Sequence, residues 1–149
     1  MIKTAANYGI ILGIVMIGIQ IVSSIVGIPL LVVVAYVIGI MYTTAVYRDK
    51  YLDGTISYGN SLLFGILVSG FTFIIIGVYL YVFISFNRDE FRQIFNTILE
   101  NMKTQGYPVS DIQESMMYNP VFLIVSYLFT GLLGGLVVSA ITSIFTKKK

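Results

Sequence analysis

The residues best suited to acid–base or metal chemistry are four carboxylates in one polar stretch, Asp89, Glu90, Asp111 and Glu114. The chain has no histidine and no cysteine, so an activated nucleophile would need one of these acids as its base. Each pair lies where a helix is expected to start, and helix capping explains such acids without catalysis. Their oxygens would also suit calcium or magnesium, but their spacing does not favour a metal site. We therefore expect no catalytic, metal or cofactor-binding site, and no enzyme.

Two amides, Gln20 and Asn60, are the strongest polar groups in the apolar stretches, which hold no ionisable residue other than tyrosine. Proton relays and ion-coupled carriers usually place acids or bases inside the membrane. One or two amides among several helices more often form interhelical hydrogen bonds than line a pore, and Asn60 could also cap a helix near the interface. A path lined by both amides is the alternative, in which the chain is a small transporter or channel subunit acting as an oligomer.

The overall composition is that of a membrane protein. Of the 149 residues, 57% are hydrophobic and 11% are charged, whereas globular domains have roughly 25% charged residues. Four spans of about 20 residues would leave room for one extramembrane segment of any size, residues 87–119. The net charge of +2 comes from scattered or terminal basic residues, with no basic face interleaved with aromatic rings. Nucleic acid is therefore not an expected partner.

Long apolar runs predict the transmembrane helices. Gly27 and Pro29 separate the first two runs, and proline at this point favours a tight helical hairpin. A short charged loop, residues 47–57, follows the second run and should be exposed. The pattern predicts an all-α polytopic membrane protein: one membrane domain forming a four-transmembrane-helix up-and-down bundle, with an extracytoplasmic helical segment between the third and fourth spans. The expected spans are about residues 5–26, 30–46, 58–86 and 120–145.

Lysine and arginine are distributed unequally between the two sides of such a bundle. The side with both termini and the 47–57 loop carries six of them, and the side with residues 87–119 carries three. Because cytoplasmic loops hold the excess of basic residues, both termini are expected in the cytoplasm and residues 87–119 outside. The residues counted are Lys3, Arg48, Lys50, Lys147, Lys148 and Lys149 on the first side, and Arg88, Arg92 and Lys103 on the second.

The outer segment contains the strongest helical periodicity in the chain. Asn87 and Glu90 have the spacing of a capping box, Gly106 should end the helix, and Ser110 should cap a shorter helix after it. The repeat itself places six apolar residues on one face. They are Phe91, Ile94, Phe95, Ile98, Leu99 and Met102.

That apolar face needs something to cover it. Half-burying its six side chains would contribute on the order of 5 to 9 kcal/mol, which is too much to leave in water. The charges of the polar face are balanced, unlike those of a basic helix on anionic lipid. The face is therefore expected either to pack on its own bundle or on the membrane surface, or to bind a partner as a helix in a groove.

Small residues recur four apart in every expected span. Small residues let helix backbones approach closely, which associates helices where water cannot drive them together. These stripes are expected to seal the bundle to itself, with a homodimer seam at residues 131–135 as the alternative. The packing candidates are Gly9, Gly13, Gly39, Gly65, Gly131 and Gly135.

The arginine-containing loop and the start of the third span, YRDKYLDGTISYGNSLLFG, form a recognisable passage with Gly54, Ser57, Tyr58, Gly59 and Gly65. With the outer segment FNRDEFRQIFNTILENMKTQGYPVSDIQESM, it resembles a family of small uncharacterised inner-membrane proteins of Bacteroidota, a domain of unknown function. The resemblance covers essentially the whole chain. It implies the fold and an inner-membrane location, and it transfers no activity.

Together these features predict a multi-pass protein of the bacterial inner membrane with no enzymatic activity. We expect a scaffold or accessory subunit that associates through its outer amphipathic helix or through its spans. Its expected partners are the lipid bilayer and either a second copy of the chain or a membrane or periplasmic protein.

Overall fold

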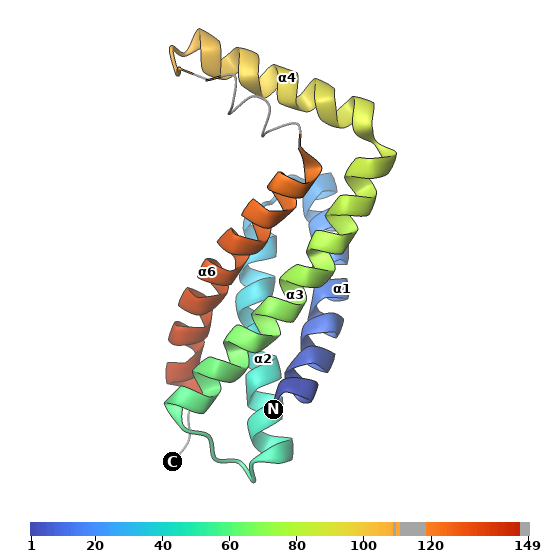
Figure 1. The fold of residues 1–149 in the computed structure, drawn as a ribbon. Helices are drawn as coiled ribbons and strands as arrows, with labels where there is room; N and C mark the ends of the chain where they lie inside the picture. The colour runs from blue at the N-terminus through green and yellow to red at the C-terminus, as the bar shows by residue number, and fades with distance from the viewer. Residues whose placement is uncertain (109, 111–118, 147–149) are drawn as a thin grey trace. The chain divides into compact units, whose positions relative to one another are not determined.

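The computed structural model describes residues 1–108, 110 and 119–146. These residues form no β-strand, and four of their helices are long and apolar enough to cross a membrane, which confirms the predicted all-α class with four spans. The shorter helix expected after Ser110 lies outside the described residues. The helices in chain order are α1 (Ile2–Val26), α2 (Leu30–Tyr51), α3 (Tyr58–Phe86), α4 (Arg88–Thr104) and α6 (Pro120–Thr146) (Figure 1).

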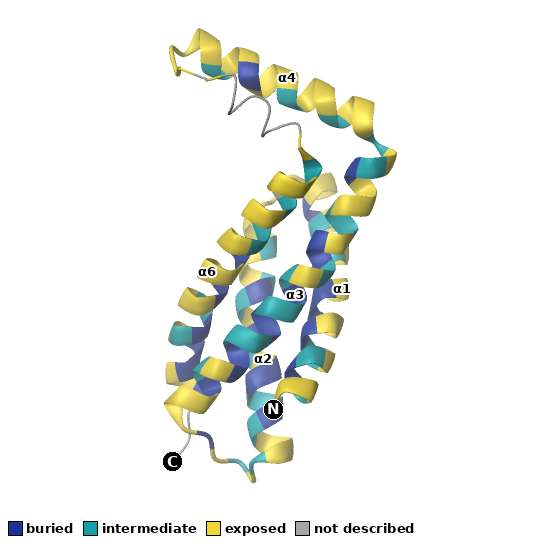
Figure 2. Cartoon of the chain, viewed as in Figure 1, coloured by how far each residue is buried: buried dark blue, intermediate teal, exposed yellow. Residues whose placement is uncertain are grey.

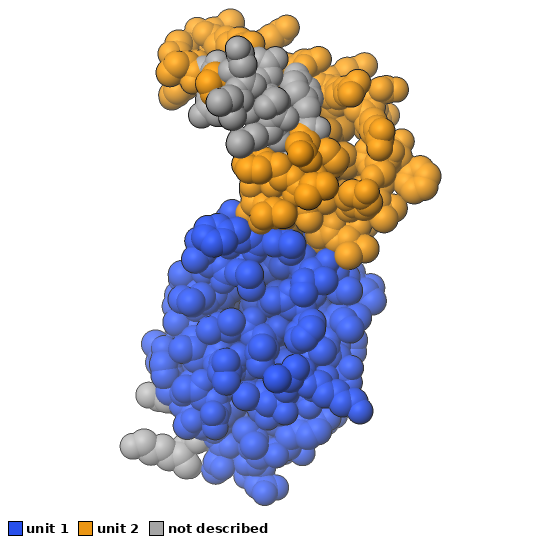
Figure 3. Space-filling view, viewed as in Figure 1, with its two compact units in different colours: residues 1–76, 128–149 blue, residues 77–127 orange. Residues whose placement is uncertain are grey.

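The chain forms two compact units (Figure 3). The first unit is residues 1–76 and 128–149, and it holds α1, α2, most of α3 and most of α6. The second unit is residues 77–127, and it holds the end of α3, all of α4 and the start of α6.

The four helical stretches of the first unit lie side by side and alternate in direction (Figure 1). Burial follows one side of each helix, while the opposite side exposes large apolar side chains (Figure 2). In α3 the fully buried residues include Phe64 and Val68, and α3 is the most buried of the four helices. An exposed apolar surface around a packed interior is the pattern expected when the surrounding solvent is lipid.

The connection between α1 and α2 consists of residues 27–29. Gly27 has a φ of 74°, in the left-handed region that glycine adopts without strain, and its N–H donates to the Ser23 carbonyl at 2.9 Å. The Ser23 hydroxyl donates to the Ile28 carbonyl at 2.7 Å. Pro29 then leads into α2, so glycine stops one helix and proline starts the next.

α2 is longer than the span over residues 30–46 that the apolar run predicts. It continues to Tyr51 because Tyr47 is buried, with its ring stacked on that of Phe64 at a centroid distance of 4.0 Å. The turn that follows has Asp53 and Gly54 at positive φ, 49° and 80°. Residues 47–51, which were expected to form part of an exposed loop, are therefore helical.

In the second unit, α3 and α4 are separated only by Asn87. Its side-chain amide donates to the Phe83 carbonyl at 2.9 Å and makes no cap bond to α4. The predicted capping box with Glu90 was therefore wrong, because the unsatisfied carbonyls of the last turn of α3 lie within reach of this amide. The expected end of α4 is confirmed: Gly106 has a φ of 80°, and the Tyr107 N–H donates to the Met102 carbonyl at 3.0 Å.

Candidate functional site

α4 divides the predicted apolar face into a covered part and an exposed part. Leu99 is 3% exposed and Phe91, Phe95 and Met102 are half-buried, whereas Ile94 is 58% exposed and Ile98 is 40% exposed. The Phe91 and Phe95 rings lie 4.5 Å apart between centroids. Part of the face is thus used inside the second unit, and we call Ile94 and Ile98 the exposed strip.

Three of the predicted packing glycines lie between α3 and α6. A Cβ atom on Gly65 would lie 2.6 Å from the Ser139 hydroxyl oxygen, and one on Gly135 would lie 2.6 Å from the Ser69 Cβ. One on Gly131 would lie 2.4 Å from the Phe73 ring. The two helices therefore approach closely enough in antiparallel register that no side chain fits at these three positions.

The other three packing glycines serve α1 and α2. A Cβ on Gly9 would lie 2.5 Å from the Phe71 Cβ, and one on Gly13 would lie 2.8 Å from the Ile75 Cβ, so α1 packs on α3 in parallel. A Cβ on Gly39 would meet Leu12 at 2.4 Å. Of the three glycines in the homodimer segment 131–135, only Gly134 has open space around it, since Gly131 and Gly135 face α3.

The two candidate amides lie far from each other. Gln20 is half-buried late in α1, where its backbone carbonyl accepts from Ser24 at 2.9 Å. Asn60 is exposed in the first turn of α3, with its backbone N–H 3.3 Å from the Ser57 hydroxyl. Because α1 and α3 run in the same direction, these residues lie toward opposite ends of the first unit. The structure does not bring them together to line a single path.

The four carboxylates proposed for acid–base or metal chemistry are only partly described. Asp89 and Glu90 are exposed in the first turn of α4, and Asp111 and Glu114 lie outside the described residues. Within the described ranges, no three histidine, cysteine, aspartate or glutamate side chains gather closely enough to hold a metal ion.

An apolar groove of about 480 Å³ runs between α1 and α2. Leu12, Met16 and Ala35 are among its walls, and its polar groups are the hydroxyls of Tyr8, Tyr42 and Thr43. The Thr43 hydroxyl already donates to the Gly39 carbonyl at 2.9 Å. The groove suits a hydrocarbon chain, because its walls are almost entirely apolar.

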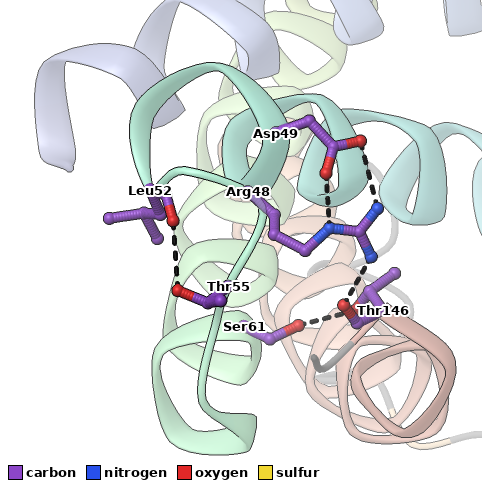
Figure 4. Close-up of polar contacts among 6 residues, drawn as sticks. All are labelled: Arg48, Asp49, Leu52, Thr55, Ser61 and Thr146. Carbon is purple, nitrogen blue, oxygen red and sulfur yellow. Dashed lines mark hydrogen bonds and ion pairs between the residues drawn. The ribbon is translucent and has the colours of Figure 1, made fainter. Parts of the chain in front are cut away.

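Sequence reasoning missed a polar cluster around Arg48 in the first unit (Figure 4). The guanidinium binds the Asp49 carboxylate through both oxygens, at 2.7 and 3.1 Å. It also donates to the backbone carbonyl of Thr146 at 2.8 Å, and the Thr146 and Ser61 hydroxyls lie 2.7 Å apart. The Arg48 side chain is 11% exposed. It therefore joins the ends of α2 and α6, which no local sequence pattern indicates because the partners are distant in the chain.

Further hydroxyls on α2 and α6 are buried as well. Thr44, Ser139 and Ser143 have buried side-chain oxygens with no hydrogen-bond partner in the described part of the chain. We call Thr44, Ser61, Ser139, Ser143 and Thr146 the hydroxyl cluster. Neutral hydroxyls of this kind can donate and accept hydrogen bonds.

The sequence as a whole matches a family model described as "Protein of unknown function (DUF4199)" over residues 7–148. The chain belongs to the DUF4199 family. Neither a curated protein nor a solved structure matches it. The match confirms that the chain resembles a family of unknown function. It spans α2, α3 and α4 completely and most of α1 and α6, so the exposed strip and the hydroxyl cluster both lie within the DUF4199 region.

Proposed function

We propose that this DUF4199 protein is an integral protein of the bacterial inner membrane, with four spans, both termini in the cytoplasm and α4 outside. The distribution of lysine and arginine supports this orientation. Its proposed role is that of a non-enzymatic accessory subunit that holds a membrane or periplasmic protein through α4.

The observation that carries this proposal is the division of the α4 face. Leu99 is buried within the second unit, whereas Ile94 and Ile98, one turn apart on the same helix, stay more than a third exposed. Isoleucines at this spacing form the kind of ridge that a groove on another protein accepts. The polar face of α4 supports a protein partner over lipid, because Asp89, Glu90 and Glu100 offset its basic residues.

Site-directed photo-crosslinking tests the proposal. Because the chain has no cysteine of its own, an introduced cysteine is the single site that the label can modify. A cysteine replaces Ile98, the exposed position, and carries a photoreactive label in intact membranes. Leu99→Cys and Thr97→Cys are matched controls on the buried side and on the polar face of α4. We expect Ile98→Cys to crosslink a second protein that neither control captures.

The captured protein must also co-purify with the unmodified chain and be lost on Ile94→Asp substitution. If Ile98→Cys crosslinks only to its own chain or to lipid, the accessory-subunit proposal is wrong. Labelling of cysteines at Asp53 and Thr97 with a membrane-impermeant reagent tests the orientation separately, and we expect only Thr97→Cys to react from outside.

A channel or transporter subunit is a second candidate, because three buried hydroxyls lack partners within the described part of the chain. Such hydroxyls could exchange hydrogen bonds with water or a small neutral solute. The test is solute entry into proteoliposomes, followed by light scattering, for the unmodified chain and for Ser143→Val. Rates equal to those of protein-free vesicles would rule this candidate out.

A further inference from the structure

A cavity of about 210 Å³ lies within the second unit at the elbow between α3 and α4. Its lining consists of Ile84, Ser85, Arg88, Phe91, Arg92 and Pro120. The space is several times the roughly 30 Å³ that one water occupies in the liquid, so it accommodates a polyatomic group. Half of this lining is polar, and two exposed arginines on one small cavity favour an anion as its occupant.

Both arginines are exposed, in the first and second turns of α4. The structure gives neither Arg88 nor Arg92 an ion-pair partner among the described residues. Glu90 is two positions from each of them, on the opposite side of the helix, and Asp89, three positions before Arg92, makes no ion pair with it in the described part of the chain. Arg88 and Arg92 are one turn apart on the same face, where like charges repel and an anion between them would remove the repulsion.

The start of α6 adds to the positive potential of this cavity. Pro120 is both a lining residue and the first residue of α6. The Asn119 side-chain oxygen accepts from the Val121 N–H at 3.0 Å, which marks this end as a capped helix N-terminus. The N-terminal end of the helix dipole is positive and favours a nearby anion.

Aromatic residues on α3 indicate the depth of the cavity in a membrane. Tyr79 and Phe83 stack with their ring centroids 6.1 Å apart, and Tyr81 is 51% exposed. Such residues collect at the level of the lipid headgroups. Ser85 and Arg88 follow within about two helical turns, so the cavity would lie beside the phosphates of the outer leaflet.

We propose that this cavity binds a phosphate group, held by the guanidinium forks of Arg88 and Arg92. The planar fork of arginine matches phosphate oxygens bidentately. The inferred source is the headgroup of an anionic phospholipid, with free inorganic phosphate as the other source of the same chemistry. The lipid assignment rests on the four-span placement proposed above, whereas the binding of phosphate itself does not.

The test uses the full-length protein in detergent, where both ends are accessible whatever the orientation in a membrane. Native mass spectrometry measures retention of phosphatidylglycerol against phosphatidylcholine, and thermal unfolding measures stabilisation by inorganic phosphate against chloride at equal ionic strength. The variant is Arg88→Gln with Arg92→Gln. Its control, Lys3→Gln with Lys50→Gln, removes the same charge at two exposed positions.

We expect phosphatidylglycerol affinity to fall by about tenfold or more in the arginine variant and to be unchanged in the lysine control. Phosphate-specific stabilisation that the arginine variant loses, without lipid selectivity, would support the site and name free phosphate as the source. Equal loss in both variants, or no loss in either, would overturn the proposal. Arg92→Lys, which keeps the charge, covers the case in which the double variant does not fold, and it should bind more weakly than the unmodified chain.

Because this binding is measured in detergent, its failure would leave the membrane orientation and the exposed strip untouched. Conversely, failure of the crosslinking test at Ile98 would not affect the phosphate site.

Discussion

Arg48 near the end of α2 donates a hydrogen bond to the backbone carbonyl of Thr146, the last residue of α6, at 2.8 Å. Carbonyls in the last turn of a helix have no partner within that helix and carry the negative end of its dipole. A guanidinium that is already paired with Asp49 satisfies one of them here. One side chain thereby holds together the C-terminal ends of two helices that are far apart in the sequence.

Loss of this side chain should destabilise the first unit. We expect Arg48→Ala to lower the free energy of unfolding by about 1 to 2 kcal/mol, because it removes charged hydrogen bonds and leaves a helix-end carbonyl unsatisfied. Denaturant unfolding in detergent measures this change. Lys50→Ala, an exposed cation in the same turn, is the control, and equal losses in the two variants would contradict the structural role of Arg48.

Adjacent glycines in α6 should respond in opposite ways to alanine. A Cβ at Gly135 would lie 2.6 Å from the Ser69 Cβ, whereas a Cβ at Gly134 meets nothing within 4 Å. Overpacking of this kind costs about 1 to 3 kcal/mol, so Gly135→Ala should lower the unfolding midpoint. Gly134→Ala should keep or raise the midpoint because alanine favours the helix. A larger loss at Gly134 would mean that α6 packs through another face.

The Tyr36 hydroxyl donates to the Ser69 hydroxyl at 2.7 Å in the buried interior. Interhelical hydrogen bonds in membrane proteins contribute about 0.6 kcal/mol on average. A double-mutant cycle of Tyr36→Phe and Ser69→Ala should return a coupling energy of about that size. Strict additivity of the two unfolding free energies would show that the two hydroxyls do not interact.

Leu99 and Ile98 are neighbours with different surroundings, and substitution should separate them. Leu99→Ala should open a cavity and lower stability by about 2 kcal/mol or more, because Leu99 is 3% exposed. Ile98→Ala, at 40% exposure, should change stability little while weakening capture of the partner. Hydrogen exchange of the α4 amides distinguishes the two outcomes. Equal protection in both variants would argue against the division of the face.

Removing a buried hydroxyl without a hydrogen-bond partner should affect stability less than removing one that has a partner. Ser143→Ala deletes a buried oxygen that has no hydrogen-bond partner in the described part of the chain, so stability should hold or increase. Ser61→Ala removes the partner of Thr146 and should cost about 1 kcal/mol. If Ser143→Ala is instead the more damaging change in thermal unfolding, that hydroxyl holds a water or a solute.

Local signals in the sequence predicted most of the fold. Long apolar runs define the membrane helices, Gly27 and Gly106 stop two helices at positive φ, and the apolar repeat of residues 91–102 defines α4. These features depend on the chemistry of neighbouring residues alone. They can be predicted without a structure because helix periodicity and backbone conformation are local properties.

What sequence reasoning could not supply depends on contacts across the chain. The stacking of Tyr47 on Phe64 keeps α2 helical beyond the apolar run, and the partner of Arg48 is a carbonyl 98 residues away. Asn87 has the sequence of a helix start but serves the end of the preceding helix. In the first two cases a group distant in the sequence overrides a local preference, whereas Asn87 chooses between two local uses, a carbonyl four residues earlier and the start of α4.

The small residues at the contact between α3 and α6 form a repeat, and this repeat alone does not determine how the two helices are aligned along their length. Small residues recur every four positions in both helices, so sliding one past the other by one turn, about 5.4 Å, would again set small against small. The contacts that do not repeat, Phe73 against Gly131 and Arg48 against Thr146, therefore select one alignment from several that the small residues alone would permit.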